Sequence, residues 1–167
     1  MTQPVADALQ PWPDTVDWHP VSPRLATLQR VEVLLGLLVP VAAAVAVYLI
    51  WDWIWALLIG GVFVVAALVR IVLIGRSVRS WGYAERDDDL LVRHGRIVRH
   101  LSIVPYARMQ FVDVSAGPLE RLFGLATVQL HTAAAASDAR VPGLVPAEAA
   151  RLRDRLTALG EIRTEGL

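Results

Sequence analysis

Two long apolar runs dominate the hydrophobic pattern of the chain. The first, Val33 to Ile50, contains no charged residue. At ~1.5 Å per residue, a helix of that length spans most of a ~30 Å hydrocarbon core. The second run, Ile54 to Gly75, has Arg70 as its single charge, and the short segment Trp51-Asp52-Trp53 separates the two runs. The pattern predicts a hairpin of two transmembrane helices, at about residues 31–50 and 54–75, with Asp52 capping the second helix.

Charge placement predicts how this hairpin is oriented. Arginines flank it at one end and are absent from the connecting turn: Arg24 and Arg30 before the first run, and Arg70, Arg76 and Arg79 at the end of the second. Positive residues stay on the cytoplasmic side. We therefore expect a multi-pass protein of the bacterial inner membrane with both termini cytoplasmic. Four tryptophans are expected to anchor it at the membrane interfaces, namely Trp51, Trp53, Trp55 and Trp81.

Two charged residues border the hydrocarbon region at similar depth. Glu32 lies 20 residues before Asp52, and Arg70 lies 18 residues after it. Charges inside a membrane are costly and tend to pair. We hypothesise an ion pair between Glu32 and Arg70. The alternative is that each side chain extends separately to the lipid headgroups.

The segments outside the hairpin differ in character. Residues 1–30 are polar and rich in proline and predict a flexible arm rather than a cleaved signal peptide. Residues 80–160 show short alternating strands, with breaks at the Asp87–Asp89 turn and at Gly117-Pro118. The predicted strands include residues 96–104, 109–115 and 126–132. An amphipathic helix begins at Pro146 and is expected to end at Gly160, leaving a tail at 161–167. The predicted class is α+β, with an antiparallel barrel or bent sheet and a C-terminal helix.

Several motifs in this region carry a family resemblance. They are Trp81-x-Tyr83-x-Glu85, Leu90-Leu91-Val92-Arg93-x-Gly95, Val104-Pro105-Tyr106-x-Arg108-x-Gln110 and Gly117-Pro118-Leu119-Glu120-Arg121-x-x-Gly124. Over about residues 30–160 the chain resembles the bacterial pleckstrin-homology-like (PH-like) membrane proteins of the YdbS-like type. The resemblance implies a PH-like fold. Members are often encoded beside a larger relative with several such modules, which implies a membrane assembly.

Composition and residue spacing argue against several kinds of functional site. The chain has no cysteine, so disulfides, thiolate nucleophiles and cysteine-bound metals are excluded. Its four histidines are scattered without a metal-ligand spacing, and no phosphate-binding glycine loop occurs. Basic and acidic residues balance at 16 each, which gives no overall field for nucleic acid. We predict no catalytic residues, no metal and no cofactor.

The remaining candidates are contact residues of the domain. The set proposed for lipid or partner contact is Arg93, His94, Arg96, Arg99, Arg108 and Gln110. The predicted function is a non-catalytic, membrane-anchored scaffold or interaction protein. Its partners are the lipid bilayer and another PH-like membrane protein or a second copy. The alternative function is a reader of anionic lipid headgroups through the Arg93–Arg99 hairpin. An ordinary solvated face would account for the same arginines.

Overall fold

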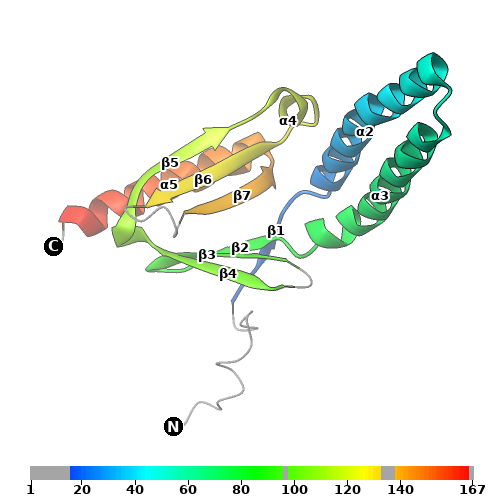
Figure 1. Cartoon of the computed structure of the whole chain (residues 1–167). Coiled ribbons are helices and arrows are strands. Elements are labelled where there is room, and N and C mark those ends of the chain that lie inside the picture. The colour runs from blue at the N-terminus through cyan, green and yellow to red at the C-terminus, as the bar shows by residue number, and fades with distance from the viewer. Residues whose placement is uncertain (1–15, 96–97, 133–137, 166–167) are drawn as a thin grey trace, which may run out of the picture. The chain divides into compact units, whose positions relative to one another are not determined.

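The computed structural model describes residues 16–95, 98–132 and 138–165. The chain divides into two compact units, a helical hairpin at residues 26–76 and a domain that combines residues up to 25 with those from 77 onward. Figure 1 shows the elements of both units.

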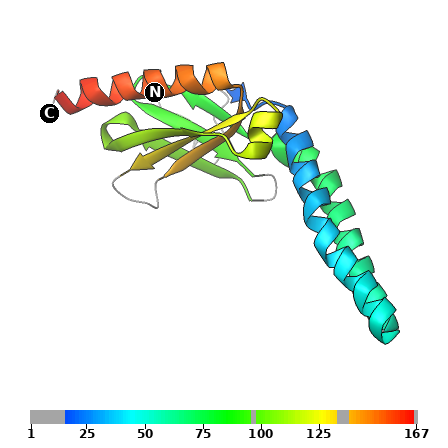
Figure 2. The ribbon, with the colours of Figure 1, turned by 90° about the horizontal axis from the view of Figure 1, so that it is seen from above.

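The hairpin consists of two antiparallel helices that lie side by side, α2 (Arg24–Trp51) and α3 (Ile54–Val78) (Figures 1 and 2). Both are long and apolar enough to cross a membrane. A Cβ atom on Gly60 would lie 2.8 Å from the Cβ of Ala44, so the missing side chain lets the helices approach closely. The two predicted helices are present, but α2 begins at Arg24 rather than near residue 31, because hydropathy detects only the apolar part of a helix.

The turn between the helices differs from the prediction at Asp52. This residue adopts a left-handed conformation, with φ of 50°, and its N–H donates to the carbonyl of Tyr48 at 2.8 Å. It therefore ends α2. Trp53, not Asp52, directly precedes α3, and the carboxylate makes no capping hydrogen bond among the described residues. The predicted cap of the second helix is wrong for this reason.

The domain contains two antiparallel sheets. The first has the order β1-β2-β3-β4, with bounds His19–Pro20, Gly82–Glu85, Asp89–His94 and His100–Pro105. The second has the order β5-β6-β7, with bounds Met109–Ser115, Ala126–Thr132 and Ala139–Leu144. A 3-10 turn, η1 (Tyr106–Arg108), joins the sheets, and a short helix, α4 (Pro118–Leu122), joins β5 to β6. The α+β class is confirmed, with two open sheets and no closed barrel among the described strands.

A C-terminal helix, α5 (Pro146–Glu165), runs along one side of the sheets (Figure 2). Its apolar stripe of Ala149, Leu152 and Leu156 is fully buried. These side chains belong to the same core as fully buried strand residues such as Leu90, Val104, Val128 and Leu130. The helix continues beyond Gly160, so the predicted tail at 161–167 is wrong for residues 161–165. Burial of the preceding stripe supports the helix past a glycine, which only weakens helical propensity.

The predicted flexible arm is wrong for residues 19–30. His19 and Pro20 pair with Tyr83 and Gly82 of β2, and α2 begins four residues later. Between them, the N–H of Ser22 donates to the carbonyl of Gly143 in β7 at 2.9 Å. Val21 and Leu25 are buried, and their burial gives this proline-rich segment the free energy to remain ordered. Residues 1–15 lie outside the described part of the chain.

Strand bounds follow the sequence prediction closely in the second sheet and less closely in the first. The predicted strands at 109–115 and 126–132 are confirmed. The strand expected from Arg96 begins only at His100. Arg96 and Ile97 lie outside the described residues.

Candidate functional site

The β3–β4 hairpin holds a column of stacked rings instead of an open cationic patch. Trp81 stacks on His94 with ring centroids 4.6 Å apart, and His94 stacks on His100 at 5.1 Å. His94 and His100 are directly opposite in the β3–β4 register, which brings their rings together. Burial, and then the charge of His100, lowers the pKa of His94 below its usual range. Both effects favour the neutral form of the His94 ring.

Arg93 is also engaged inside the domain. Its guanidinium lies 4.4 Å from the ring centroid of Trp18, a cation–π arrangement. Its stem crosses Gly82, where a Cβ atom would lie 2.9 Å from the arginine Nε. Burial lowers the pKa of Arg93. The interaction with Trp18 also gives a part of the predicted flexible arm a fixed place against the first sheet.

The predicted contact set is thus divided between different environments. Arg93 and His94 are half-buried, whereas Arg99, Arg108 and Gln110 are exposed. Arg108 belongs to η1 and Gln110 to β5, so these two lie outside the hairpin that carries the others. Arg96 is not among the described residues. The structure therefore does not gather these side chains into one cationic site.

Sequence reasoning missed an exposed aromatic residue on β5. Phe111 is 52% exposed, yet its ring stacks on His131 of β6 with centroids 4.3 Å apart. Asp138 also holds the imidazole, with its Oδ2 atom 3.2 Å from Nδ1 of His131. Asp138 also accepts a 2.8 Å hydrogen bond from the N–H of Thr132. Phe111 is consequently both accessible and held in one position. The alternation within residues 109–115 revealed the strand but not which face was open.

The strand that carries Phe111 has an open edge. β5 pairs with β6 on one side, and no strand among the described residues pairs with its other side. Most of its side chains are exposed, including that of Val114. In contrast, β7 at the opposite edge of the same sheet is almost entirely buried. An accessible strand edge with apolar side chains is a typical surface for adding a strand of a partner.

A second unpredicted cluster connects α5 to β2. Arg151 donates to both Glu85 and Glu148 at 2.7 Å, and Arg155 lies 2.9 Å from the other oxygen of Glu85. The hydroxyl of Tyr83 donates to Glu148 at 2.6 Å. The hydrogen bonds from Arg151, and then from Tyr83, lower the pKa of Glu148 to about 2. Every carboxylate of the cluster has a partner, so the arrangement is structural and holds the helix on the sheet.

The carboxylate of Glu120 holds α4 in place. Its carboxylate accepts from the N–H of Gly117 at 2.8 Å and from the hydroxyl of Thr127 at 2.7 Å. The first bond caps the helical turn and the second ties it to β6. Glu120 therefore has a structural role in the domain.

The membrane-interface anchors have different surroundings. Trp51, Trp53 and Trp55 are exposed around the turn between α2 and α3, as side chains that face lipid would be. Trp81 instead belongs to the ring column of the domain. Their contact with a membrane interface stays a prediction.

The described side chains contain no group of three or more histidine, aspartate or glutamate residues placed to hold a metal ion. The polar clusters around α4 and α5 serve hydrogen bonds that hold elements together.

Comparison with known proteins identifies the family to which this chain belongs. The sequence pattern described as the bacterial PH domain matches residues 27–159, most of the chain. This chain belongs to the bacterial PH domain family. The match covers most of α2, all of α3, the strands from β2 to β7 and most of α5, so the PH-like fold expected from the motifs is confirmed.

A named relative supports the same assignment for this bacterial PH domain protein. The UPF0699 transmembrane protein YdbS of Bacillus subtilis (strain 168) is 33% identical over 128 residues, which cover 75% of this chain and 79% of that protein. No solved structure matches the chain. Together with the two apolar helices, the relative identifies the chain as a membrane protein with a PH-like domain.

Proposed function

We propose that this protein is a non-catalytic, membrane-anchored interaction subunit that binds another PH-like domain through the open edge of β5. In this proposal it resides in the bacterial inner membrane with both termini in the cytoplasm. The arginines at the ends of the hairpin favour that orientation. The hairpin then acts as the anchor.

The observation that carries the proposal is the state of Phe111. An aromatic side chain that is half exposed would ordinarily lose conformational freedom on binding. The stack on His131, itself held by Asp138, has already fixed this ring in the free protein. Aromatic residues are enriched in the cores of protein interfaces. A fixed aromatic ring beside an unpaired strand edge suits association with a protein.

A second PH-like domain is the partner whose chemistry fits best. It brings open strand edges of its own, as β4 and β5 of this domain illustrate. Backbone N–H and C=O groups at two such edges satisfy one another, and apolar residues such as Phe111 and Val114 are then covered. The assembly implied by the family resemblance is consistent with this partner.

The alternative function, recognition of anionic headgroups by the Arg93–Arg99 hairpin, is less well supported. Such a site needs several accessible cationic side chains near one another. Arg93 instead packs on Trp18, and burial favours the neutral form of His94. Arg99 is exposed, but Arg108 lies outside this hairpin.

A paired substitution on the full-length protein tests the proposal. Phe111→Ser removes the aromatic ring from β5, and Ile103→Ser makes a comparable change on β4, where the side chain is 51% exposed. Tagged proteins are purified from native membranes, and the co-purified PH-like membrane proteins of other sequence are quantified. Phe111→Ser should lose the partner while Ile103→Ser and the wild type retain it, with equal melting temperatures.

Two outcomes would contradict the proposal. One is retention of the partner by Phe111→Ser. The other is salt-sensitive binding to anionic vesicles that Arg99→Ser abolishes and Phe111→Ser does not, since that result supports the lipid reader.

A further inference from the structure

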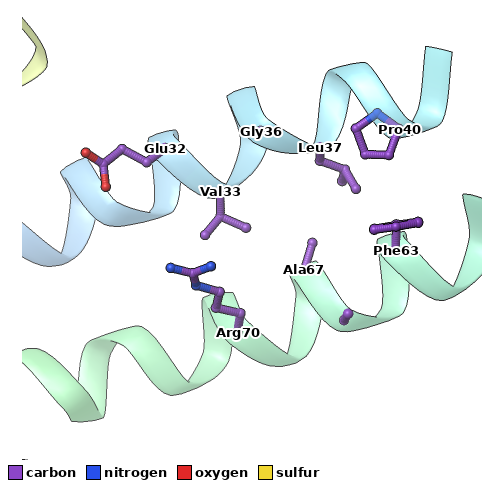
Figure 3. A pocket seen from close by; sticks show the side chains of 9 residues that line it. Glu32, Val33, Gly36, Leu37, Pro40, Phe63, Ala67 and Arg70 are labelled. Atoms are coloured by element: carbon purple, nitrogen blue, oxygen red, sulfur yellow. The ribbon is translucent and has the colours of Figure 1, made fainter. Parts of the chain in front are cut away.

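The hairpin contains a groove between α2 and α3 that the anchoring role leaves unexplained. Its volume is about 320 Å³. Apolar and small residues line most of it, among them Gly36, Phe63 and Ala67, and two opposite charges lie at one end, Glu32 and Arg70 (Figure 3). Glu32, Gly36 and Arg70 are exposed, so the groove is accessible from outside the hairpin.

The two charged groups lie at one groove without contacting each other. No ion pair within 4.0 Å joins Glu32 to Arg70 in the described part of the chain. Figure 3 shows the guanidinium of Arg70 directed toward α2 and the carboxylate of Glu32 turned away from it. The intramolecular pair expected from their similar depth is therefore not formed in the structure. Ionisable groups in a membrane segment are usually paired, so both side chains call for another partner.

Small residues leave space at the same groove. A Cβ atom on Gly36 would meet no heavy atom within 4 Å, whereas one on Gly60 would collide with Ala44. Gly60 is thus used for contact within the hairpin, and Gly36 is not. Small residues on a membrane helix allow a neighbouring helix to approach closely. The free surface at Gly36 has room for a helix from another molecule.

We propose that this groove is the contact surface between two copies of the chain in the membrane, with Glu32 of each copy paired to Arg70 of the other. A two-fold contact presents the same patch from both copies, so one acid and one base in each groove form two reciprocal ion pairs. A lipid phosphate would satisfy Arg70 but would repel Glu32. The charge pattern is therefore complementary to itself. The inference rests on the proposed interaction function and names a second copy as one partner.

Complementary charge reversals test this arrangement in the full-length protein. Glu32→Arg gives a copy with two bases in the groove, and Arg70→Glu gives a copy with two acids. Each variant should repel itself, whereas a mixture restores both ion pairs across a heterodimer. The measurement is energy transfer between differently labelled copies in membranes. Arg76→Glu reverses an exposed charge that does not line the groove and is the matched control.

The expected result is loss of energy transfer for each reversal alone and its return in the mixture, with Arg76→Glu unchanged. Wild-type transfer in either single reversal overturns the inference, as does a mixture that stays as low as the single variants. If a reversal does not insert into the membrane, Gly36→Leu fills the groove without a charge change and should abolish transfer. Transfer retained by Gly36→Leu overturns the inference too. The variants leave β5 unchanged, so the Phe111 comparison judges the proposed function separately.

Discussion

The hydroxyl group of Tyr83 donates a 2.6 Å hydrogen bond to the carboxylate of Glu148, 65 residues further along the chain. The bond joins β2, just after the second long helix, to the first turns of α5. Arg151 binds the same carboxylate and also Glu85, so β2 and α5 are held by one polar cluster. The C-terminal helix is therefore fixed on the domain by polar contacts as well as by its buried leucines.

Removing the hydroxyl group of Tyr83 from this cluster should lower the stability of the domain. Tyr83→Phe deletes a hydrogen bond to a charged acceptor, and we expect the free energy of unfolding to fall by roughly 1.5 kcal/mol. Tyr106→Phe is the matched control, because its hydroxyl donates to a neutral acceptor, the carbonyl of Arg86, at 3.0 Å. The control should lose less. Denaturant unfolding of the detergent-solubilised protein measures both, and an equal or larger loss for Tyr106→Phe would contradict the account.

The half-buried ring of His94 is expected to make the stability of the domain depend on pH. Its folded pKa is lowered below the ordinary value of 6.5 by burial and by His100. Between the lowered pKa and 6.5, the unfolded chain binds a proton that the folded domain does not. The contribution of His94 to the free energy of unfolding is therefore fully present above about pH 6.5 and decreases as the pH falls below it.

His94→Phe should weaken this dependence. The substitution keeps a ring for the stack with Trp81 and removes the titration, and the buried Nδ1 atom has no hydrogen-bond partner to lose among the described residues. Melting temperatures measured from pH 7.5 to pH 5.5 should fall less steeply in the variant than in the wild type. Parallel curves would show that His94 does not carry the effect.

The close approach of Gly143 to Leu25 attaches the start of α2 to β7. Its φ is +72°, and a Cβ atom there would lie 2.9 Å from the Cβ of Leu25. Gly143→Ala should destabilise the domain by about 1–3 kcal/mol through backbone strain and this contact. Gly117→Ala is the control, since its φ is −65° and its nearest new contact would be 3.7 Å. Equal shifts of the melting temperature in both variants would contradict the inferred role of Gly143.

The absence of cysteine allows a direct test of membrane orientation. Asp52→Cys places a thiol in the turn between the long helices, and Thr157→Cys places one on the exposed side of α5. In intact cells, a membrane-impermeant thiol reagent should label the first variant, and it should label the second only after permeabilisation. The reverse pattern would contradict the orientation inferred from the arginines.

The sequence predicts strand bounds well where an alternating pattern is interrupted by glycine or proline. The strands at 109–115 and 126–132 have their predicted bounds because Gly117-Pro118 and Gly124 interrupt an otherwise regular pattern. The buried stripe of α5 follows from helical periodicity. Its end does not, because packing of Leu156 and its neighbours extends the helix beyond Gly160.

Contacts between distant segments could not be predicted in the same way. The pairing of His19 with Tyr83 depends on burial of Val21 and Leu25, and local propensity disfavours a strand in that proline-rich segment. The partners of Phe111, Arg93 and His94 depend on strand register across separate parts of the chain. The sequence therefore identified the cationic residues but not their contacts within the domain. It also gave no sign that the ring of Phe111 is fixed.

Site-specific photocrosslinking from position 111 of the full-length protein tests the proposed interaction most directly. A photoreactive amino acid replaces Phe111 in one variant and Ile103 in the other, and crosslinked peptides from native membranes are identified by mass spectrometry. The account predicts a crosslink from position 111 to a strand of another PH-like domain, in a second copy or a family member, with little crosslinking from position 103. Lipid adducts alone at position 111, or equal protein crosslinking from both positions, would contradict it.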